Sequence, residues 1–218
     1  MPKMPQNVRG PHQGQDFQMI GKPLADAKAA MILVHGRGAS AISILSLADE
    51  FKQGEFAYLA PQASGNTWYP YSFLAEILNN QPGLDSGLQA IADLVKQAED
   101  AGIPTEKIII GGFSQGACLA MEYVARNAKR YGGAFAFSGG VIGPSGTPRD
   151  YEGSLDGTPV FLGCSDIDMH IPVERVHETA EVMEKLGGHV TKNIYPNMPH
   201  TINYDEIAHV QEIMRSLL

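Results

Sequence analysis

The chain has few cysteines, fewer basic than acidic residues, and no long apolar run. Only two of its 218 residues are cysteine, Cys118 and Cys164, and both lie in apolar segments. A disulfide framework is therefore not indicated, and a reducing, cytoplasmic location is expected. Its 16 Lys and Arg against 24 Asp and Glu give a net charge of −8, which argues against a nucleic-acid partner. The uncharged runs are strand-sized or rich in Gly, Ser and Pro, so no membrane span is expected.

What is present is the composition of a globular protein. Apolar residues make up 44% of the chain and charged residues 18%, which is not the composition of a disordered chain. A chain of this length buries roughly 70% of its unfolded surface. We therefore expect residues 1–218 to form one domain. Residues 1–15, which include His12, are polar with scattered Pro and Gly and are predicted to be a tail.

Short apolar runs alternate with amphipathic segments along the chain. The runs predict strands at Asp16–Ile20, Ala29–Val34, Phe56–Ala60, Lys107–Gly111, Gly133–Phe137, Pro159–Leu162 and Val190–Tyr195. Apolar stripes at helical spacing predict helices at Ile44–Phe51, Leu84–Ala98, Ala117–Ala128 and Val173–Leu186, and one that begins at Asn203 with a capping box to Glu206. This alternation predicts a mostly parallel sheet with helices on both faces. Ligands of such sheets bind at the carboxyl ends of the strands.

A motif of the form G-x-S-x-G follows the strand Lys107–Gly111. It reads Gly112-Phe113-Ser114-Gln115-Gly116 and leads directly into a helix. In this strand–turn–helix context the turn is tight, and the serine hydroxyl stands at the top of the sheet as a nucleophile. The alternative is a serine that only caps the helix, with glycines that permit the turn.

A carboxylate and a histidine follow the next two predicted strands. Asp166 and Asp168 come after Pro159–Leu162, and His200 comes shortly before the last helix. The order Ser, Asp, His is that of a hydrolase triad, in which histidine activates the serine and the carboxylate orients the histidine. His170 is the rival base, but a residue so close to Asp168 in sequence rarely faces it. The spacing fits no known metal motif, so no metal site is expected.

The first buried strand ends in His35-Gly36-Arg37-Gly38-Ala39-Ser40. Its glycines let the backbone turn and present N–H groups to an oxyanion. The main-chain N–H groups of Arg37 and Gln115 are the expected donors. The alternative is a glycine-rich turn that feeds a helix capped by Ser40.

Together these segments resemble the phospholipase/carboxylesterase family of α/β-hydrolases, which includes bacterial carboxylesterases and acyl-protein thioesterases. The resemblance rests on Leu33–Gly38, on Gly112–Gly116, on Asp168-Met169-His170-Ile171-Pro172 and on His200, and it spans the chain from about Ala29. It implies an α/β-hydrolase fold without a large cap domain.

The resemblance assigns roles residue by residue. Ser114 matches the nucleophile, Asp168 the acid in preference to Asp166, and His200 the base. Arg37 and Gln115 match the oxyanion donors. Arg37 departs from the thioesterases, which typically carry an apolar residue there, and we expect its side chain to point to solvent or to form a structural ion pair.

Two segments are candidates for the substrate pocket. The long connection 62–81 carries Trp68, Tyr69 and Phe73, and Met169 lies beside the proposed acid. We expect these four side chains to line an apolar pocket. The alternative for the aromatic residues is a satellite core beneath the loop.

These features predict a serine hydrolase that cleaves carboxylic esters of short to medium acyl chains through an acyl-enzyme. The alternatives are a thioesterase, a lysophospholipase or a dienelactone-type lactone hydrolase with the same triad, and a non-catalytic binding module of the same fold. No cofactor is expected, and the partner is a small-molecule ester or thioester. Exposed sheet edges would allow a homodimer, although the sequence singles out no interface.

Overall fold

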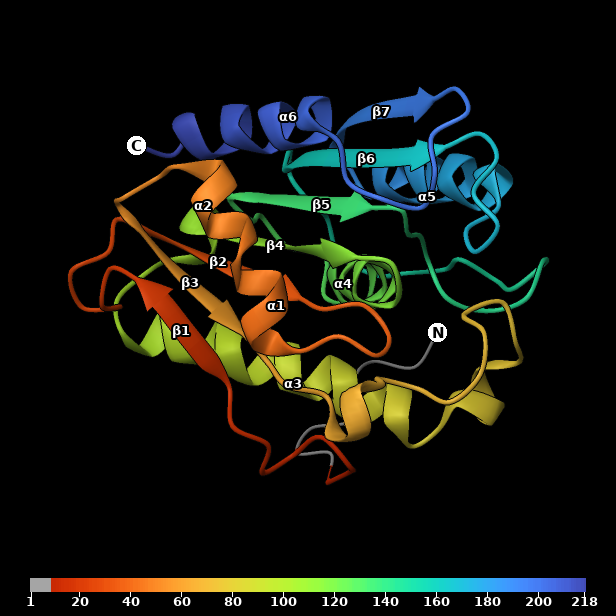
Figure 1. Ribbon diagram of the computed structural model, residues 1–218, viewed down its shortest axis with the longest axis horizontal. Coiled ribbons are helices and arrows are strands. Elements are labelled where there is room, and N and C mark those ends of the chain that lie inside the picture. Colours follow the sequence, from red (N-terminus) through yellow and green to blue (C-terminus); the bar gives the residue numbers. More distant parts are fainter. Residues whose placement is uncertain (1–8) are drawn as a thin grey trace.

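A seven-stranded β-sheet runs through the computed structural model, which describes residues 9–218 (Figure 1). The strands lie in the order β1-β3-β2-β4-β5-β6-β7. Only β1 is antiparallel to its neighbour, and all other pairs are parallel. The strands are β1 (Gln18–Gly21), β2 (Ala29–Val34), β3 (Phe56–Ala60), β4 (Ile108–Phe113), β5 (Gly133–Phe137), β6 (Pro159–Ser165) and β7 (His189–Tyr195).

Helices cover both faces of the sheet, as predicted. One face packs against α3, α4 and α5, and the other against α1, α2 and α6. The α-helices are α1 (Ala41–Leu45), α2 (Leu47–Phe51), α3 (Gly83–Asp100), α4 (Gln115–Arg126), α5 (Val173–Lys185) and α6 (Tyr204–Arg215). Three short 3₁₀ helices span Ser64–Asn66, Ile77–Asn80 and Thr105–Lys107.

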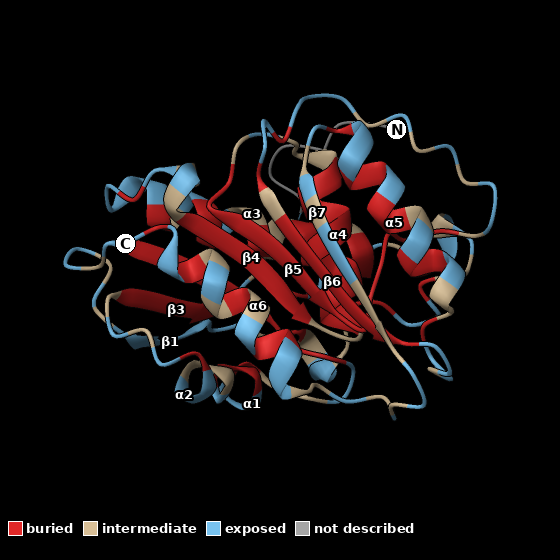
Figure 2. Ribbon diagram, turned by 90° about the horizontal axis from the view of Figure 1, so that it is seen from above, coloured by how far each residue is buried: buried red, intermediate tan, exposed pale blue. Residues whose placement is uncertain are grey.

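Burial of the inner strands on both faces explains their continuous apolar sequences. In β2 successive side chains alternate between two cores: Met31 and Leu33 face α1, α2 and α6, whereas Ile32 and Val34 face α3, α4 and α5. The inner strands are therefore almost wholly buried, whereas β1 at one edge is exposed and β7 at the other is partly exposed (Figure 2).

The predicted ends of strands are most accurate for strands that are buried on both faces. Strands β2, β3 and β5 have the predicted limits, whereas β6 continues to Ser165 because its last residues pair with β7. The predicted helix Ile44–Phe51 is instead two helices, α1 and α2, which meet at Ser46. The Ser46 hydroxyl donates to the Ser43 carbonyl at 2.8 Å, a local bond that competes with regular helix pairing.

Residues 1–8 of the expected polar N-terminal tail lie outside the described part, and residues 9–15 are mostly exposed but are held to the domain by His12. His12 is only 4% exposed. Its Nε2 is 2.8 Å from the Trp68 carbonyl, its Nδ1 accepts from the Ser64 N–H at 3.0 Å, and its own N–H donates to the Ser86 hydroxyl. Because every polar atom of the imidazole has a partner, burial leaves none unsatisfied. This segment therefore fastens the 64–68 loop to the start of α3.

The carboxyl edge of the sheet carries no cap. Residues 138–158, which connect β5 to β6, contain no helix. Both cysteines are buried and unpaired. Within residues 9–218, no helix combines the length and apolar character needed to cross a bilayer.

Candidate active site

Ser114 stands on the turn between β4 and α4 with an unusual backbone conformation. Its φ is 56° and its ψ is −121°, a combination that costs energy in a residue with a side chain. The turn is packed against the end of β2, since a Cβ atom at Gly112 or Gly116 would lie 2.3 or 2.1 Å from the Val34 carbonyl oxygen. The glycines of the motif therefore let the chain pass this carbonyl and raise Ser114 above the sheet.

A chain of hydrogen bonds links Ser114 to two residues from distant loops. His200 Nε2 is 2.9 Å from Ser114 Oγ, and His200 Nδ1 is 2.6 Å from Asp168 Oδ2. The serine follows β4, the aspartate follows β6, and the histidine lies between β7 and α6. The structure thus brings together the three residues predicted to act as nucleophile, acid and base.

The Asp168 side chain is fully buried and fully hydrogen-bonded. Oδ1 accepts the main-chain N–H groups of His170 and Ile171 at 2.8 and 3.0 Å. Burial by itself would raise the pKa of Asp168, but the bonds from His200 and from these two N–H groups outweigh it and lower that pKa. Asp168 is therefore an anion that fixes the orientation of the His200 ring.

His170, the rival base, does not compete for this position. Its main-chain N–H bonds Asp168, while its ring meets the His200 ring edge-on with centroids 4.8 Å apart. On its other side the His200 ring packs on Phe113, with centroids also 4.8 Å apart. The imidazole of His200 is thus held between two rings.

The loop that carries His200 is anchored by the first turn of α6. Asn203 and Glu206 form the predicted capping box, in which each side chain accepts the main-chain N–H of the other residue. Glu206 is fully buried, and burial raises its pKa to about 7. Its second oxygen, Oε1, is unpartnered among the described residues and lies above Gly163 of β6.

Two main-chain N–H groups beside Ser114 are free to bind an oxyanion. Gln115 is the first residue of α4, where the N–H has no partner inside the helix. In the loop after β2, the N–H groups of Gly38 and Ala39 donate to Asn66 and Gly36. Those of Arg37 and Gln115 make no hydrogen bond within residues 9–218.

A pocket of about 530 Å³ opens in front of Ser114. Tyr69 and Phe73 line it. Its other apolar walls are Pro70, Tyr71, Phe113, Cys118 and Ile171. Burial raises the pKa of the Cys118 thiol to about 12, so this side chain is a neutral part of the pocket wall and no rival nucleophile.

Two predicted pocket residues do not line the pocket. Trp68 is fully buried behind the wall, where its indole packs between the rings of His12 and His35 and donates to the His35 carbonyl. It belongs to the satellite core that was the alternative prediction. Met169 is 93% exposed, whereas Ile171, whose main-chain N–H bonds Asp168, is buried.

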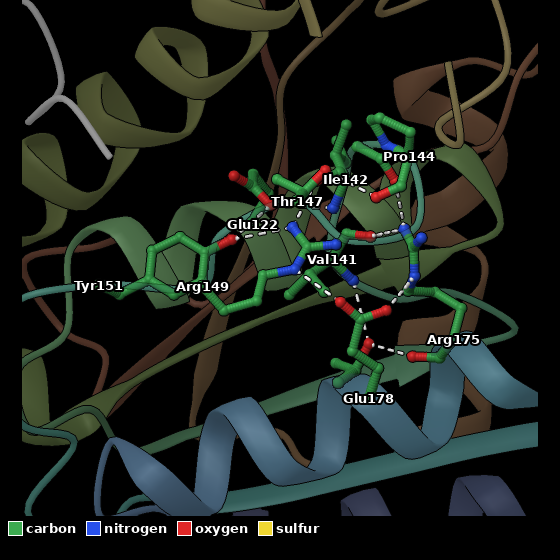
Figure 3. A network of polar contacts seen from close by, with 11 residues as sticks. Glu122, Val141, Ile142, Pro144, Thr147, Arg149, Tyr151, Arg175 and Glu178 are labelled. Carbon is green, nitrogen blue, oxygen red and sulfur yellow. Dashed lines mark hydrogen bonds and ion pairs between the residues drawn. The ribbon is translucent and has the colours of Figure 1, made fainter. Parts of the chain in front are cut away.

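A network of polar contacts connects α4 and α5 with the loop after β5 (Figure 3). Arg175 of α5 donates to the carbonyls of Val141 and Gly143, and the Gly143 N–H donates to the carbonyl of Phe73. Glu122 of α4 accepts from the Ile142 N–H and from Tyr151. The network fixes the loop after β5, and through Gly143 it fixes Phe73 in the pocket wall.

Sequence reasoning missed several of these residues. The charged pair Glu122 and Arg126 gave no signal because it looks like an exposed i,i+4 pair on a helix, yet both side chains are buried. Cys118 lies one turn beyond Ser114, and this spacing alone would have placed it beneath Ser114. In the part of the chain that the structure describes, no cluster of His, Cys, Asp and Glu could hold a metal ion.

Comparison with known proteins identifies the family. The profile described as Phospholipase/Carboxylesterase matches residues 15–218. The chain belongs to this family. A phospholipase/carboxylesterase from Dyadobacter fermentans has a crystal structure that is 44% identical in sequence, with a TM-score of 0.90 over 96% of this chain and 100% of that one. The α/β-hydrolase fold and the assignment as a hydrolase of this family are thereby established.

Two more distant similarities extend over most of the chain. Acyl-protein thioesterase 1 of Debaryomyces hansenii is 28% identical over 88% of this chain and 92% of its own length. The Bacillus cereus carboxylesterase shares the fold at 18% identity, with a TM-score of 0.74 over 94% of this chain and 96% of that one.

Proposed function

We propose that this family member is a serine esterase that cleaves carboxylic esters of short to medium acyl chains. The observation that carries the proposal is the hydrogen-bonded series Asp168–His200–Ser114 at the mouth of an apolar pocket. A serine hydroxyl is a weak nucleophile at neutral pH, and a histidine oriented by a carboxylate activates it.

The reaction follows from the positions of these groups. Ser114 Oγ bonds to the acyl carbon while its proton passes to His200 Nε2, and the carbonyl oxygen becomes an anion. The free N–H groups of Arg37 and Gln115 stabilise that anion. His200 then protonates the departing alcohol, which leaves the acyl group on Ser114. A water molecule, deprotonated by His200, releases the acid and restores the serine.

The pocket supports the substrate class. Its walls include Tyr69, Tyr71, Phe73 and Phe113, which suit an apolar group. No helical cap lies over it, because residues 138–158 contain no helix. Because the pocket is open to solvent, it can bury a short or medium acyl chain but cannot enclose a long one.

The first test is the Ser114→Ala variant with nitrophenyl butyrate. We expect kcat/KM to fall by about four orders of magnitude, because losing one member of a triad removes most of the rate enhancement. A fluorophosphonate should label the parent chain and Ser154→Ala, an exposed serine, but not Ser114→Ala. Undiminished turnover in Ser114→Ala would refute the proposal, and failure to label the parent chain would favour a binding module.

Thioester hydrolysis is the second candidate function, favoured by the relatives named acyl-protein thioesterase. Matched butyryl, octanoyl and palmitoyl oxoesters and thioesters distinguish the two. We expect butyryl and octanoyl oxoesters to give the highest kcat/KM. A preference of ten-fold or more for the thioesters, or for the palmitoyl chain, would reassign the substrate.

A further inference from the structure

Arg37 is exposed, but its side chain is bonded to the main chain and not to a carboxylate. Its Nη2 donates to the carbonyls of Tyr69 at 2.9 Å and Tyr71 at 2.7 Å, and its Nη1 donates to the carbonyl of Pro70 at 3.0 Å. No carboxylate within residues 9–218 pairs with it. One guanidinium therefore binds three successive carbonyls of the pocket wall.

The side chain of Gln115 bonds the same stretch of the pocket wall. Its Nε2 donates to the Tyr69 carbonyl at 2.9 Å, and its Oε1 accepts the Trp68 N–H at 3.0 Å. The Tyr69 carbonyl thus accepts from both Arg37 and Gln115. These are also the two residues whose main-chain N–H groups are free beside Ser114.

These bonds add to the pairing of β2 with β4, which already brings the two backbone segments close together. Arg37 lies on a glycine-flanked loop after β2, and Gln115 begins α4. Hydrogen bonds from a charged donor are stronger than neutral ones. A planar guanidinium can also hold several acceptors at once, which a lysine ammonium on a flexible stem does less well.

We propose that the Arg37 side chain is a positioning residue for the oxyanion hole. Together with the Gln115 amide it clamps the Tyr69 carbonyl, and this clamp sets the distance between the Arg37 and Gln115 N–H groups. The inference rests on the proposed function, because it needs an oxyanion at Ser114. In this proposal the Arg37 side chain helps to stabilise the transition state by positioning the oxyanion donors, and it does not bind a charged group of the substrate.

The test compares Arg37→Met, which keeps a long side chain without donors, with Arg37→Lys. Oxyanion contacts strengthen only as charge develops, so their loss lowers kcat and spares KM. We expect Arg37→Met to lower kcat for nitrophenyl butyrate by about 10- to 100-fold, since small misplacements of catalytic groups cost this much. KM should change less than three-fold, and Arg37→Lys should recover part of kcat.

A trifluoromethyl ketone gives the second readout. Ser114 Oγ adds to its carbonyl carbon, the proton passes to His200, and the oxygen becomes an anion in the same hole. Its affinity should fall in Arg37→Met by the same factor as kcat. Arg130→Met is the matched control, because Arg130 also donates to a main-chain carbonyl, that of Asp156, but at the amino edge of the sheet.

The outcomes separate the two proposals. If the parent chain hydrolyses the ester but Arg37→Met keeps its kcat and its affinity for the ketone, the clamp is refuted. A rise in KM with unchanged kcat would also refute it and would assign Arg37 to substrate binding. If the parent chain neither turns over esters nor reacts with a fluorophosphonate, the proposed function fails instead. Should Arg37→Met not fold, the same comparison is made with Arg37→Lys, for which an intermediate loss of kcat is expected.

Discussion

Asp168 shows how much one residue depends on its local backbone. One carboxylate oxygen accepts two main-chain N–H groups, and the other accepts from His200. The two main-chain bonds fix the backbone of the loop that follows Asp168. The bond from His200 favours the tautomer that carries its proton on Nδ1. Nε2 is thereby left as an acceptor toward Ser114.

Replacing Asp168 by Asn tests this tautomer argument. The amide oxygen can keep the two N–H bonds, but its NH₂ group would face His200 Nδ1 and force the proton onto Nε2. We expect kcat for nitrophenyl butyrate to fall by about 10⁴-fold with little change in the fold. Asp166→Asn is the matched control, because Asp166 bonds the Asn197 N–H and not His200. Equal losses in the two variants would contradict the assignment.

At the level of single residues, the sequence was informative wherever a motif dictates backbone geometry. The glycines around Ser114 and the proline after Asp168 carry such information. Trp68 and Met169 were misplaced because an apolar side chain in a loop can face inward or outward, and composition does not say which. The direction of the Arg37 side chain depends on carbonyls 32 to 34 residues away in the chain.

Among the elements, α6 is unusual because its first turn contains a fully buried carboxyl group, that of Glu206. Glu206 closes the capping box of the helix and sits against β6 at Gly163. Burial raises its pKa to about 7 in the folded chain, whereas an unfolded glutamate titrates near ~4.3. The folded state therefore binds this proton more tightly, and stability falls as the pH rises from about 4.3 to about 7.

The variant Glu206→Gln should remove this dependence. It keeps the shape and the capping acceptor but carries no ionisable group. We expect it to be more stable than the parent chain at pH 8, by up to about 3 kcal/mol, and similar to it near pH 4.5. Urea unfolding at the two pH values measures the difference. Glu212→Gln, an exposed position on the same helix, should show no such pH-dependent gain, and an equal gain there would contradict the argument.

The element boundaries show the same division between local and distant causes. The Asn203 cap of α6 was predicted because its signal lies within four residues. The extension of β6 was not, because it depends on pairing with a strand 30 residues later. The split between α1 and α2 has a local cause, the Ser46 hydroxyl bond to the Ser43 carbonyl, but an apolar stripe at helical spacing does not reveal it.

For the whole molecule, two buried histidines connect the N-terminal segment to the site. His12 and His35 contact Trp68 from two sides. His12 Nδ1 and His35 Nε2 each accept a main-chain N–H, from Ser64 and Ala63. Burial lowers the pKa of both imidazoles, so both are neutral in the fold.

The folding stability contributed by these histidines should therefore decrease at acidic pH. Because the folded pKa lies below the unfolded value of ~6.5, the histidines favour the fold above pH 6.5, and this contribution is lost as the pH falls through the folded pKa. We expect His12→Gln to lose less stability than the parent chain between pH 7.5 and 5.5, by up to about 1.4 kcal/mol per pH unit. Urea unfolding checks this, with the exposed His177→Gln as control. A parallel loss in all three chains would show that His12 does not titrate on unfolding.

For the whole molecule, the fold was predictable from the sequence, but the packing of the N-terminal segment against the domain was not. Alternating apolar and amphipathic segments predict a parallel sheet, and this prediction does not depend on the conformation of the loops. The burial of His12 depends instead on acceptors and donors at residues 64, 68 and 86, which only the finished fold brings together.

The wide separation of the three hydrogen-bonded residues also bears on how the chain folds. His200 meets Ser114 across 86 residues and Asp168 across 32, and the contacts join the ends of β4, β6 and β7. Such long-range contacts form late in folding, after the loops between them have closed. Ester hydrolysis during refolding would therefore report completion of the sheet, whereas helix content measured by circular dichroism would be regained earlier.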